Sequence, residues 1–139
     1  MEIEHFDKNL KNLNLDYRLN PGATDDEINV VQDRLGINIP EQVWMFYKSM
    51  NGLFVEHPRL EIFDLSNLEL KDSKVIFSEF DGKHKIAFST NTINDAQQWD
   101  IVNNETGYCI THSMASFWSN KIWAWLRKNR EIWEREIYT

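Results

Sequence analysis

The sequence predicts an α+β fold, because helical and strand-forming patterns occupy separate stretches of the chain. Residues 2–52 carry the periodicity and end signals of helices, residues 53–112 hold short β-favouring runs, and helical periodicity returns after Ser113. This order lacks the strand–helix alternation of an α/β sheet. The 139 residues fit one domain, which we place at 1–139.

The first element is a short amphipathic helix within residues 2–19. Ile3, Phe6, Leu10 and Leu13 follow the i, i+3, i+7, i+10 spacing of one buried helix face. The run Asn20-Pro21-Gly22 then predicts a turn.

Residues 20–54 carry the clearest local signals. Thr24 and Glu27 have the spacing of a capping box, in which each side chain accepts a hydrogen bond from the other residue's backbone N–H. Gly36 suits the left-handed residue that ends a helix, and Pro40 suits the start of the next one. The segment therefore predicts two consecutive helices, the second ending at Asn51-Gly52.

Short strands are predicted after Gly52, and the final helix after the last of them. The strands lie at 53–55, 60–63, 75–80, 85–89, 98–103 and 108–112, with 64–74 as a loop or a single helical turn. His57-Pro58 should limit pairing between the first two. From Ser113 or Ser116 onward, one helical stripe holds Trp118, Ile122, Trp125, Leu126 and Trp133, with Ile132 and Ile137 at its edges and Trp123 outside it.

The last predicted hairpin connects residues 98–103 to 108–112 through a four-residue loop. This loop places Trp99 opposite His112, Ile101 opposite Ile110 and Asn103 opposite Tyr108, on the side that we expect to meet the helices. The other side carries Asp100, Val102, Cys109 and Thr111.

The residues that could support catalysis or metal binding do not form a recognisable motif. His5, His57, His84 and His112 lack metal-ligand spacing, and no glycine-rich phosphate loop or G-x-S-x-G motif is present. Cys109 and His112 could form an activated nucleophile, but residues three apart in a regular strand point to opposite faces. We therefore predict a structural cysteine, a histidine at the sheet rim, no enzyme activity and no metal or cofactor.

Charge and cysteine content limit the function classes. A net charge of −7 argues against general binding to nucleic acid or anionic membranes, which depends on clustered Lys and Arg. The single cysteine excludes an intramolecular disulfide, and the polar N-terminus lacks a signal-peptide core. The chain is therefore expected to be soluble and cytoplasmic.

An acidic bias is concentrated in residues 56–81, which hold seven acidic and three basic side chains. One interpretation is a surface that docks a basic partner, with charge accelerating the encounter. The other is an ordinary acidic surface that keeps strand edges soluble.

The opening of the chain resembles the SMI1/KNR4 family of the SUKH superfamily. The matching residues are Gly22, Ile28, Leu35, Gly36, Ile39, Pro40, Phe46, Asn51 and Gly52, followed less specifically by 77–88, 99–110 and Ser116-Phe117. The glycine-rich turn common in the family is reduced here to Asp81-Gly82-Lys83-His84-Lys85.

This resemblance implies an antiparallel sheet packed with N-terminal helices and a C-terminal helix, and a binding role without catalysis. Bacterial relatives resemble immunity proteins, each of which neutralises a cognate toxin, frequently a nuclease. Longer fungal relatives are regulatory or scaffolding proteins. A regulatory module without a toxin partner, and a small enzyme using Cys109 or a His–Asp pair, remain as alternatives.

If the partner is a basic toxin, acidic and aromatic residues around the exposed side of the sheet should contact it. These candidate contact residues are Glu56, Glu61, Asp64, Glu79, Asp81, Trp99 and Asp100.

Overall fold

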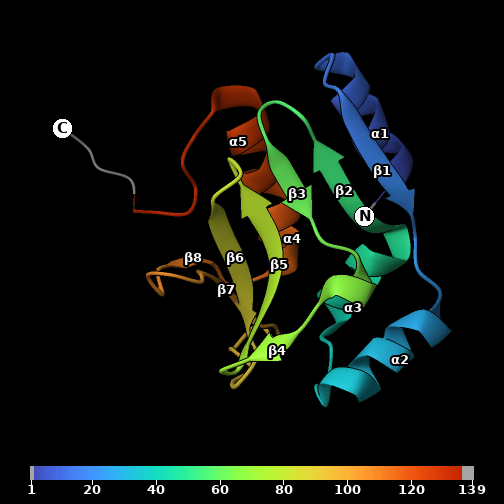
Figure 1. The fold of residues 1–139 in the computed structure, drawn as a ribbon, viewed down its shortest axis with the longest axis vertical. Helices are drawn as coiled ribbons and strands as arrows, with labels where there is room; N and C mark the ends of the chain where they lie inside the picture. Colours follow the sequence, from blue (N-terminus) through green and yellow to red (C-terminus); the bar gives the residue numbers. More distant parts are fainter. Residues whose placement is uncertain (1, 136–139) are drawn as a thin grey trace.

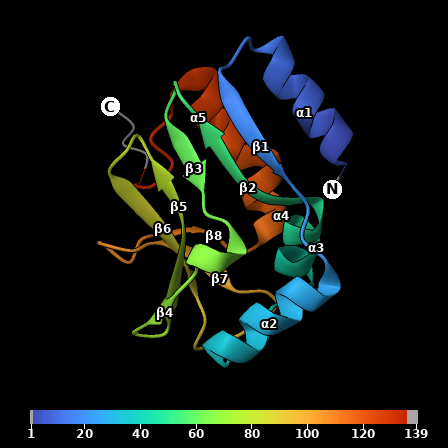
Figure 2. The ribbon, with the colours of Figure 1, turned by 45° about the vertical axis from the view of Figure 1, so that its right-hand side comes forward.

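The computed structural model describes residues 2–135, which form five α-helices, two short helical segments and an eight-stranded antiparallel sheet (Figures 1 and 2). The helices are α1 (Ile3–Asn12), α2 (Asp25–Leu35), α3 (Glu41–Ser49), α4 (Met114–Ser116) and α5 (Ile122–Lys128), with a 3₁₀ turn η1 (Leu65–Asn67) and a π-helical turn η2 (Phe117–Lys121). The strands are β1 (Tyr17–Pro21), β2 (Met50–Val55), β3 (Leu60–Ile62), β4 (Leu70–Lys71), β5 (Lys74–Phe80), β6 (His84–Ser89), β7 (Asp100–Asn103) and β8 (Cys109–Thr111). The predicted α+β class is confirmed.

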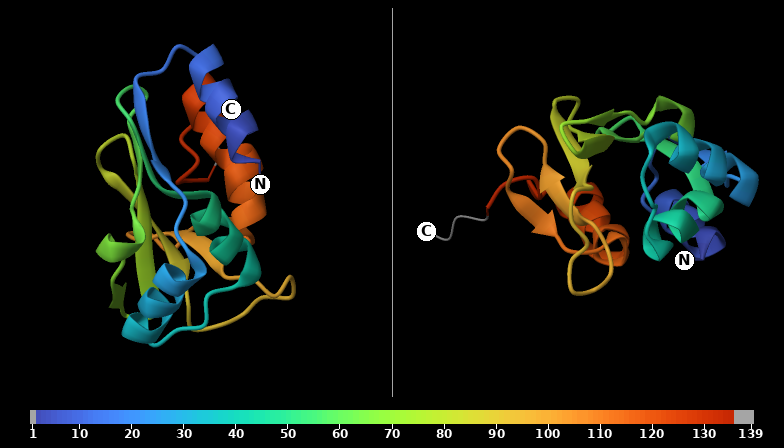
Figure 3. Two further views of the ribbon diagram at one scale, coloured as in Figure 1. Left: turned by 90° about the vertical axis from the view of Figure 1, so that its right-hand side faces the viewer. Right: turned by 90° about the horizontal axis from the view of Figure 1, so that it is seen from below.

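The sheet has one face covered by helices and one open face. Its strand order is β1-β2-β3-β5-β6-β7-β8, with β4 paired only to β5. Helices α1, α3, α4 and α5 lie on one side of the strands, which we call the inner face (Figure 3). Within residues 2–135, no α-helix lies over the other side of β3, β5 and β6, which we call the outer face, and the short η1 borders it (Figure 3).

The inner face is the hydrophobic core, and aromatic rings dominate it. Phe77 and Phe88 stack with their ring centroids 3.9 Å apart, and Phe117 from η2 meets Phe77 edge-on at 5.2 Å. Ile101 and Ile110 are also buried there, as predicted for the isoleucine side of the last hairpin. Burial of such side chains is the main favourable contribution to folding.

The predicted ends of α2 are confirmed, whereas α3 ends at Ser49 and its predicted stop at Asn51-Gly52 lies inside β2. Thr24 and Glu27 form both hydrogen bonds of the capping box, and Gly36 ends α2 in the left-handed conformation at φ +65°. Gly22 lies so close to α3 that a Cβ there would be 1.8 Å from the Lys48 carbonyl oxygen. Asn51 accepts a hydrogen bond from the Leu65 N–H at 2.8 Å and so anchors η1. The residues that resemble the SMI1/KNR4 signature therefore hold the helices against the sheet.

Other boundaries also differ from the prediction: β2 starts at Met50, and β4 forms within the predicted loop 64–74. Residues 17–21 form β1, which the sequence placed in the first helix and the following turn; Tyr17 pairs with Val55 there because tertiary pairing with β2 overrides local propensity. The C-terminal helix ends at Asn129, which adopts a left-handed conformation, so Trp133 is not on the helical stripe. Trp133 instead folds back and stacks on His84 at 4.2 Å. Ile137 lies outside the described residues.

Trp123, which the sequence places off the stripe, contacts α1 at Phe6, with ring centroids 4.9 Å apart. The Arg127 guanidinium lies over the Trp123 ring, 4.8 Å from its centroid. No helix within residues 2–135 has the length and apolar character needed to cross a membrane.

Candidate functional site

A row of charged side chains crosses the outer face of the central strands. Glu61 of β3 pairs directly with Glu79 of β5, and Glu79 pairs on its other side with Lys85 of β6. Phe54 of β2 lies on the other side of Glu61. Two carboxylates therefore face each other across neighbouring strands, and a basic residue flanks only one of them.

A hollow of about 600 Å³ opens on the same face, next to this row. Phe63 and Ile76 contribute apolar surface to its lining, and Glu79, Lys85 and Lys74 contribute charge. An open surface of this kind, with partly exposed apolar groups among charges, suits contact with another macromolecule.

The remaining predicted acidic residues are not part of this row. Glu56 and Asp81 lie in neighbouring turns at one end of the sheet, where the Asp81 N–H donates to the Arg59 carbonyl at 2.9 Å. Asp64 caps η1, and its side chain accepts hydrogen bonds from the Asn67 N–H and the Ser66 hydroxyl. The structure therefore brings Glu61 and Glu79 together and leaves Glu56, Asp64 and Asp81 elsewhere.

The predicted place of Trp99 at the exposed side of the sheet is wrong. Its side chain is 3% exposed and packs in the core against Phe88, with ring centroids 5.4 Å apart. Trp99 comes directly before β7, two residues from Ile101, and so points to the same inward side as Ile101. Its large apolar ring is therefore buried with the other core aromatics.

Asp100 does lie on the outer face, as does Cys109, and a bulge in β8 brings His112 to it. Val102 pairs with Cys109 but Ile101 pairs with Thr111, so Ile110 is an extra residue in β8. An extra residue shifts the alternation of a strand by one position. His112 therefore returns to the face that carries Cys109.

This bulge corrects three sequence-based expectations. The pairings of Ile101 with Ile110 and of Trp99 with His112 are wrong, whereas Asn103 does lie opposite Tyr108, whose carbonyl accepts its N–H at 2.9 Å. Cys109 and His112 are on the same face, not on opposite faces, and Cys109 Sγ lies 3.7 Å from His112 Nδ1. Sequence patterns missed this arrangement because nothing in the run Tyr108–His112 marks a bulge.

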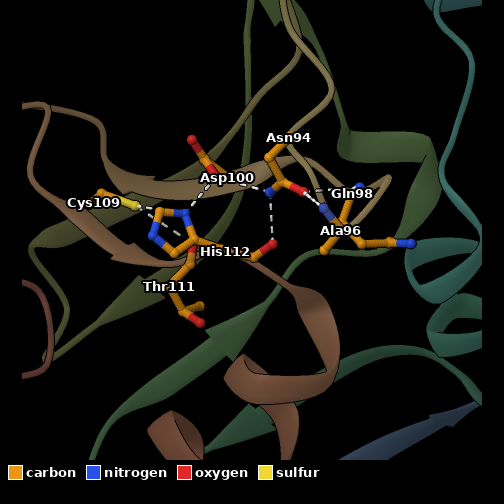
Figure 4. Close-up of polar contacts among 7 residues, drawn as sticks. All are labelled: Asn94, Ala96, Gln98, Asp100, Cys109, Thr111 and His112. Atoms are coloured by element: carbon orange, nitrogen blue, oxygen red, sulfur yellow. Dashed lines mark hydrogen bonds and ion pairs between the residues drawn. The ribbon is translucent and has the colours of Figure 1, made fainter.

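The cluster formed by Asp100, Cys109 and His112 is held together by Asn94 (Figure 4). His112 Nδ1 lies 2.8 Å from Asp100 Oδ1. Asn94 Nδ2 donates to Asp100 Oδ1 at 2.9 Å and to the His112 carbonyl at 2.7 Å. Asn94, which the sequence analysis did not single out, thereby connects the loop before β7 to the residue after β8.

The electrostatics of the cluster favour a charged carboxylate and a protonated thiol. Hydrogen bonds from His112 first, and then from Asn94, hold the pKa of Asp100 below its ordinary value. Burial, and then the nearby Asp100 charge, raise the pKa of Cys109.

This geometry does not resemble a nucleophile–base–acid relay. In such a relay, the nucleophile contacts one ring nitrogen of the histidine and the orienting carboxylate contacts the other. Here Cys109 Sγ and Asp100 Oδ1 both approach Nδ1 of His112. Convergence of sulfur, nitrogen and oxygen on one point is instead typical of ligands around a metal ion.

Comparison of the chain with protein-family models and with curated proteins finds no match.

Proposed function

We propose that this chain is a non-enzymatic protein-binding domain whose outer sheet face binds a basic partner protein in a stoichiometric complex. The resemblance to the SMI1/KNR4 family supports a bacterial toxin as this partner and a role of the domain as its immunity protein. The Glu61–Glu79 pair, beside a hollow with partly exposed apolar groups, supports a partner that brings a cation to this pair, while the lining of the hollow itself holds three acidic and three basic side chains.

The direct pairing of Glu61 with Glu79 is the observation that carries this proposal. Like charges directly opposite each other in an antiparallel sheet destabilise the fold. Features that lower stability and are only partly compensated nearby are characteristic of functional surfaces, and here Lys85 pairs with Glu79 while Glu61 pairs on its other side with Phe54. A cation from a partner, placed between the two carboxylates, would relieve their repulsion only in the complex.

The alternative of a small enzyme using Cys109 has less support. A nucleophilic cysteine reacts as the thiolate, and such cysteines have a lowered pKa. The pKa of Cys109 is raised, and its sulfur contacts the same nitrogen of His112 as Asp100 does.

The proposal is tested by co-expression with the toxin domain encoded beside this gene. We expect the chain to rescue growth and to copurify with that domain. The variant Glu61→Lys places a cation opposite Glu79, so it should keep the fold while weakening the complex about tenfold or more.

A matched control is Asp33→Lys, which makes the same charge change at an exposed position on α2. Unchanged affinity of Glu61→Lys, or an equal loss in Asp33→Lys, would contradict the outer-face assignment. Absence of both rescue and copurification would favour the regulatory module without a toxin partner.

A further inference from the structure

We propose that Asp100, Cys109 and His112 form a binding site for a divalent transition metal ion, with Zn²⁺ as the fitting ion. These residues are the one group of three potential metal ligands that residues 2–135 bring together, with one ligand atom from each lying within 4.8 Å of the other two. The proposal shares only Asp100 with the predicted partner contacts and does not depend on the Glu61–Glu79 pair that carries the proposed function.

The chemistry of the three ligands selects the metal. Zn²⁺ accepts thiolate sulfur, imidazole nitrogen and carboxylate oxygen in one tetrahedral site. Ca²⁺ and Mg²⁺ prefer sites made of oxygen ligands, so a cysteine and a histidine disfavour both. Cys109 would bind as the thiolate and release its proton to solvent.

Two spacings of the ligand atoms are close to those of a tetrahedral site, and the spacing between Cys109 and Asp100 is within 4.8 Å. Usual zinc–ligand distances place sulfur about 3.6 Å from nitrogen and nitrogen about 3.3 Å from oxygen. In the structure, Cys109 Sγ is 3.7 Å and Asp100 Oδ1 is 2.8 Å from His112 Nδ1. Metal binding therefore requires the carboxylate and the ring to separate by about half an ångström, which small side-chain rotations supply.

A second layer of contacts orients these ligands. Asn94 Nδ2 holds Asp100 Oδ1 and the backbone of His112 in place, and the Asn94 side-chain oxygen accepts hydrogen bonds from the N–H groups of Ala96 and Gln98. Such outer contacts usually account for a 10–100-fold difference in metal affinity. The loop 94–98 thus supports the site although it supplies no ligand.

The site is accessible and has room for a fourth ligand. The His112 side chain is 75% exposed and that of Asp100 is 34% exposed. Three protein ligands with an open position are typical of zinc sites that bind water or an external group. Because Asp100 begins β7 and Cys109 and His112 flank the bulge of β8, the ion would also tie these two strands together.

The experiment uses the untagged protein after a chelator has removed bound metal. Titration with Zn²⁺ in competition with a chromophoric chelator measures the affinity, and titration with Co²⁺, a spectroscopic substitute for Zn²⁺, reports the ligands. We expect one equivalent to bind, with thiolate-to-cobalt charge-transfer absorption and a rise in melting temperature on Zn²⁺ addition. Cys109→Ser should remove the charge-transfer absorption and weaken binding more than 100-fold, since loss of a ligand exceeds loss of an outer contact. Asn94→Ala should weaken binding 10–100-fold.

Matched controls separate this site from general histidine binding. His112→Ala changes a largely exposed side chain and should abolish binding, whereas His57→Ala, an exposed histidine in the β2–β3 turn, should leave it unchanged. Absence of charge-transfer absorption in the unmodified protein, or equal affinity of Cys109→Ser, would overturn the proposal.

Discussion

The two faces of the sheet differ in how completely their polar and charged groups are matched. On the inner face, the buried Asn103 donates from Nδ2 to the Trp133 carbonyl at 2.8 Å, and aromatic rings fill the space around it. On the outer face, Glu61 and Glu79 oppose each other, and a thiol, an imidazole and a carboxylate converge. The inner face is arranged for stability, and the outer face retains interactions that a partner or an ion could complete.

This difference predicts that substitutions on the two faces have effects of different size and sign. Inner-face changes should lower the free energy of unfolding, because they remove buried contacts. Outer-face changes should lower stability much less, or raise it, and should alter binding instead.

The largest effect is expected for Phe117→Ala. Phe117 is fully buried and lies edge-on to Phe77 and Phe80, so its truncation should lower the free energy of unfolding by about 3–5 kcal/mol. Denaturation in urea, followed by tryptophan fluorescence, measures this loss. The matched control is Phe54→Ala, which removes a half-buried ring from the outer face. Its expected loss in the free energy of unfolding is about 1 kcal/mol. Equal losses would remove the distinction between the faces.

A smaller loss is expected for Asn103→Ala. This change leaves the buried Trp133 carbonyl without its donor and removes the acceptor for the N–H groups of Glu105 and Thr106. The expected cost is about 1–3 kcal/mol, measured by the same denaturation. A loss below 0.5 kcal/mol, a value typical of surface changes, would mean that water replaces these bonds.

Glu61→Gln should have the opposite sign. It removes one charge of the like-charged pair with Glu79, so the free energy of unfolding should rise by about 0.2–1 kcal/mol. The urea midpoint at low ionic strength measures this gain, which salt should reduce. Glu105→Gln at the exposed hairpin tip serves as the control and should change little. Destabilisation by Glu61→Gln would mean that the pair is not repulsive.

The smallest effect concerns Tyr17, whose hydroxyl donates to Asp7 of α1 at the margin of the inner face. Burial, and then Asp7, raise the pKa of Tyr17 from 10.0 to about 12. Because the pKa of Tyr17 is raised in the folded state, its neutral hydroxyl stabilises the fold. This stabilisation is fully present below pH 10 and is lost between pH 10 and about 12. Tyr17→Phe should therefore show a weaker loss of stability across this interval than the unmodified protein. Identical pH profiles would contradict the contact with Asp7.

The sequence predicted the elements whose signals are local. The capping box at Thr24, the helix end at Gly36 and the hairpin about Asp81-Gly82 each depend on a few neighbouring residues, and the structure has all three. It did not predict β1, because Tyr17–Pro21 becomes a strand only through pairing with distant β2. Nor did it predict the end of α5 at Asn129, because helical spacing extends past the residue where the backbone turns.

The candidate site was predicted only in part for the same reason. Glu61 and Asp100 reach the outer face because they follow the regular alternation of their strands, whereas Glu79 does so past a register shift of β5 between Ile76 and Ser78. The cluster at Cys109 depends on the irregular pairing of Ile110, which no spacing rule indicates.

The bulge in β8 also affects how the sheet ends. An outermost strand presents unpaired backbone groups to which a foreign strand can add, which is a common route to aggregation. β8 is only three residues long and its pairing is interrupted at Ile110, while at the opposite margin β1 ends in Pro21, which has no N–H to donate. Both margins are therefore poor templates for another strand, so an incoming protein is directed to the side chains of the open face.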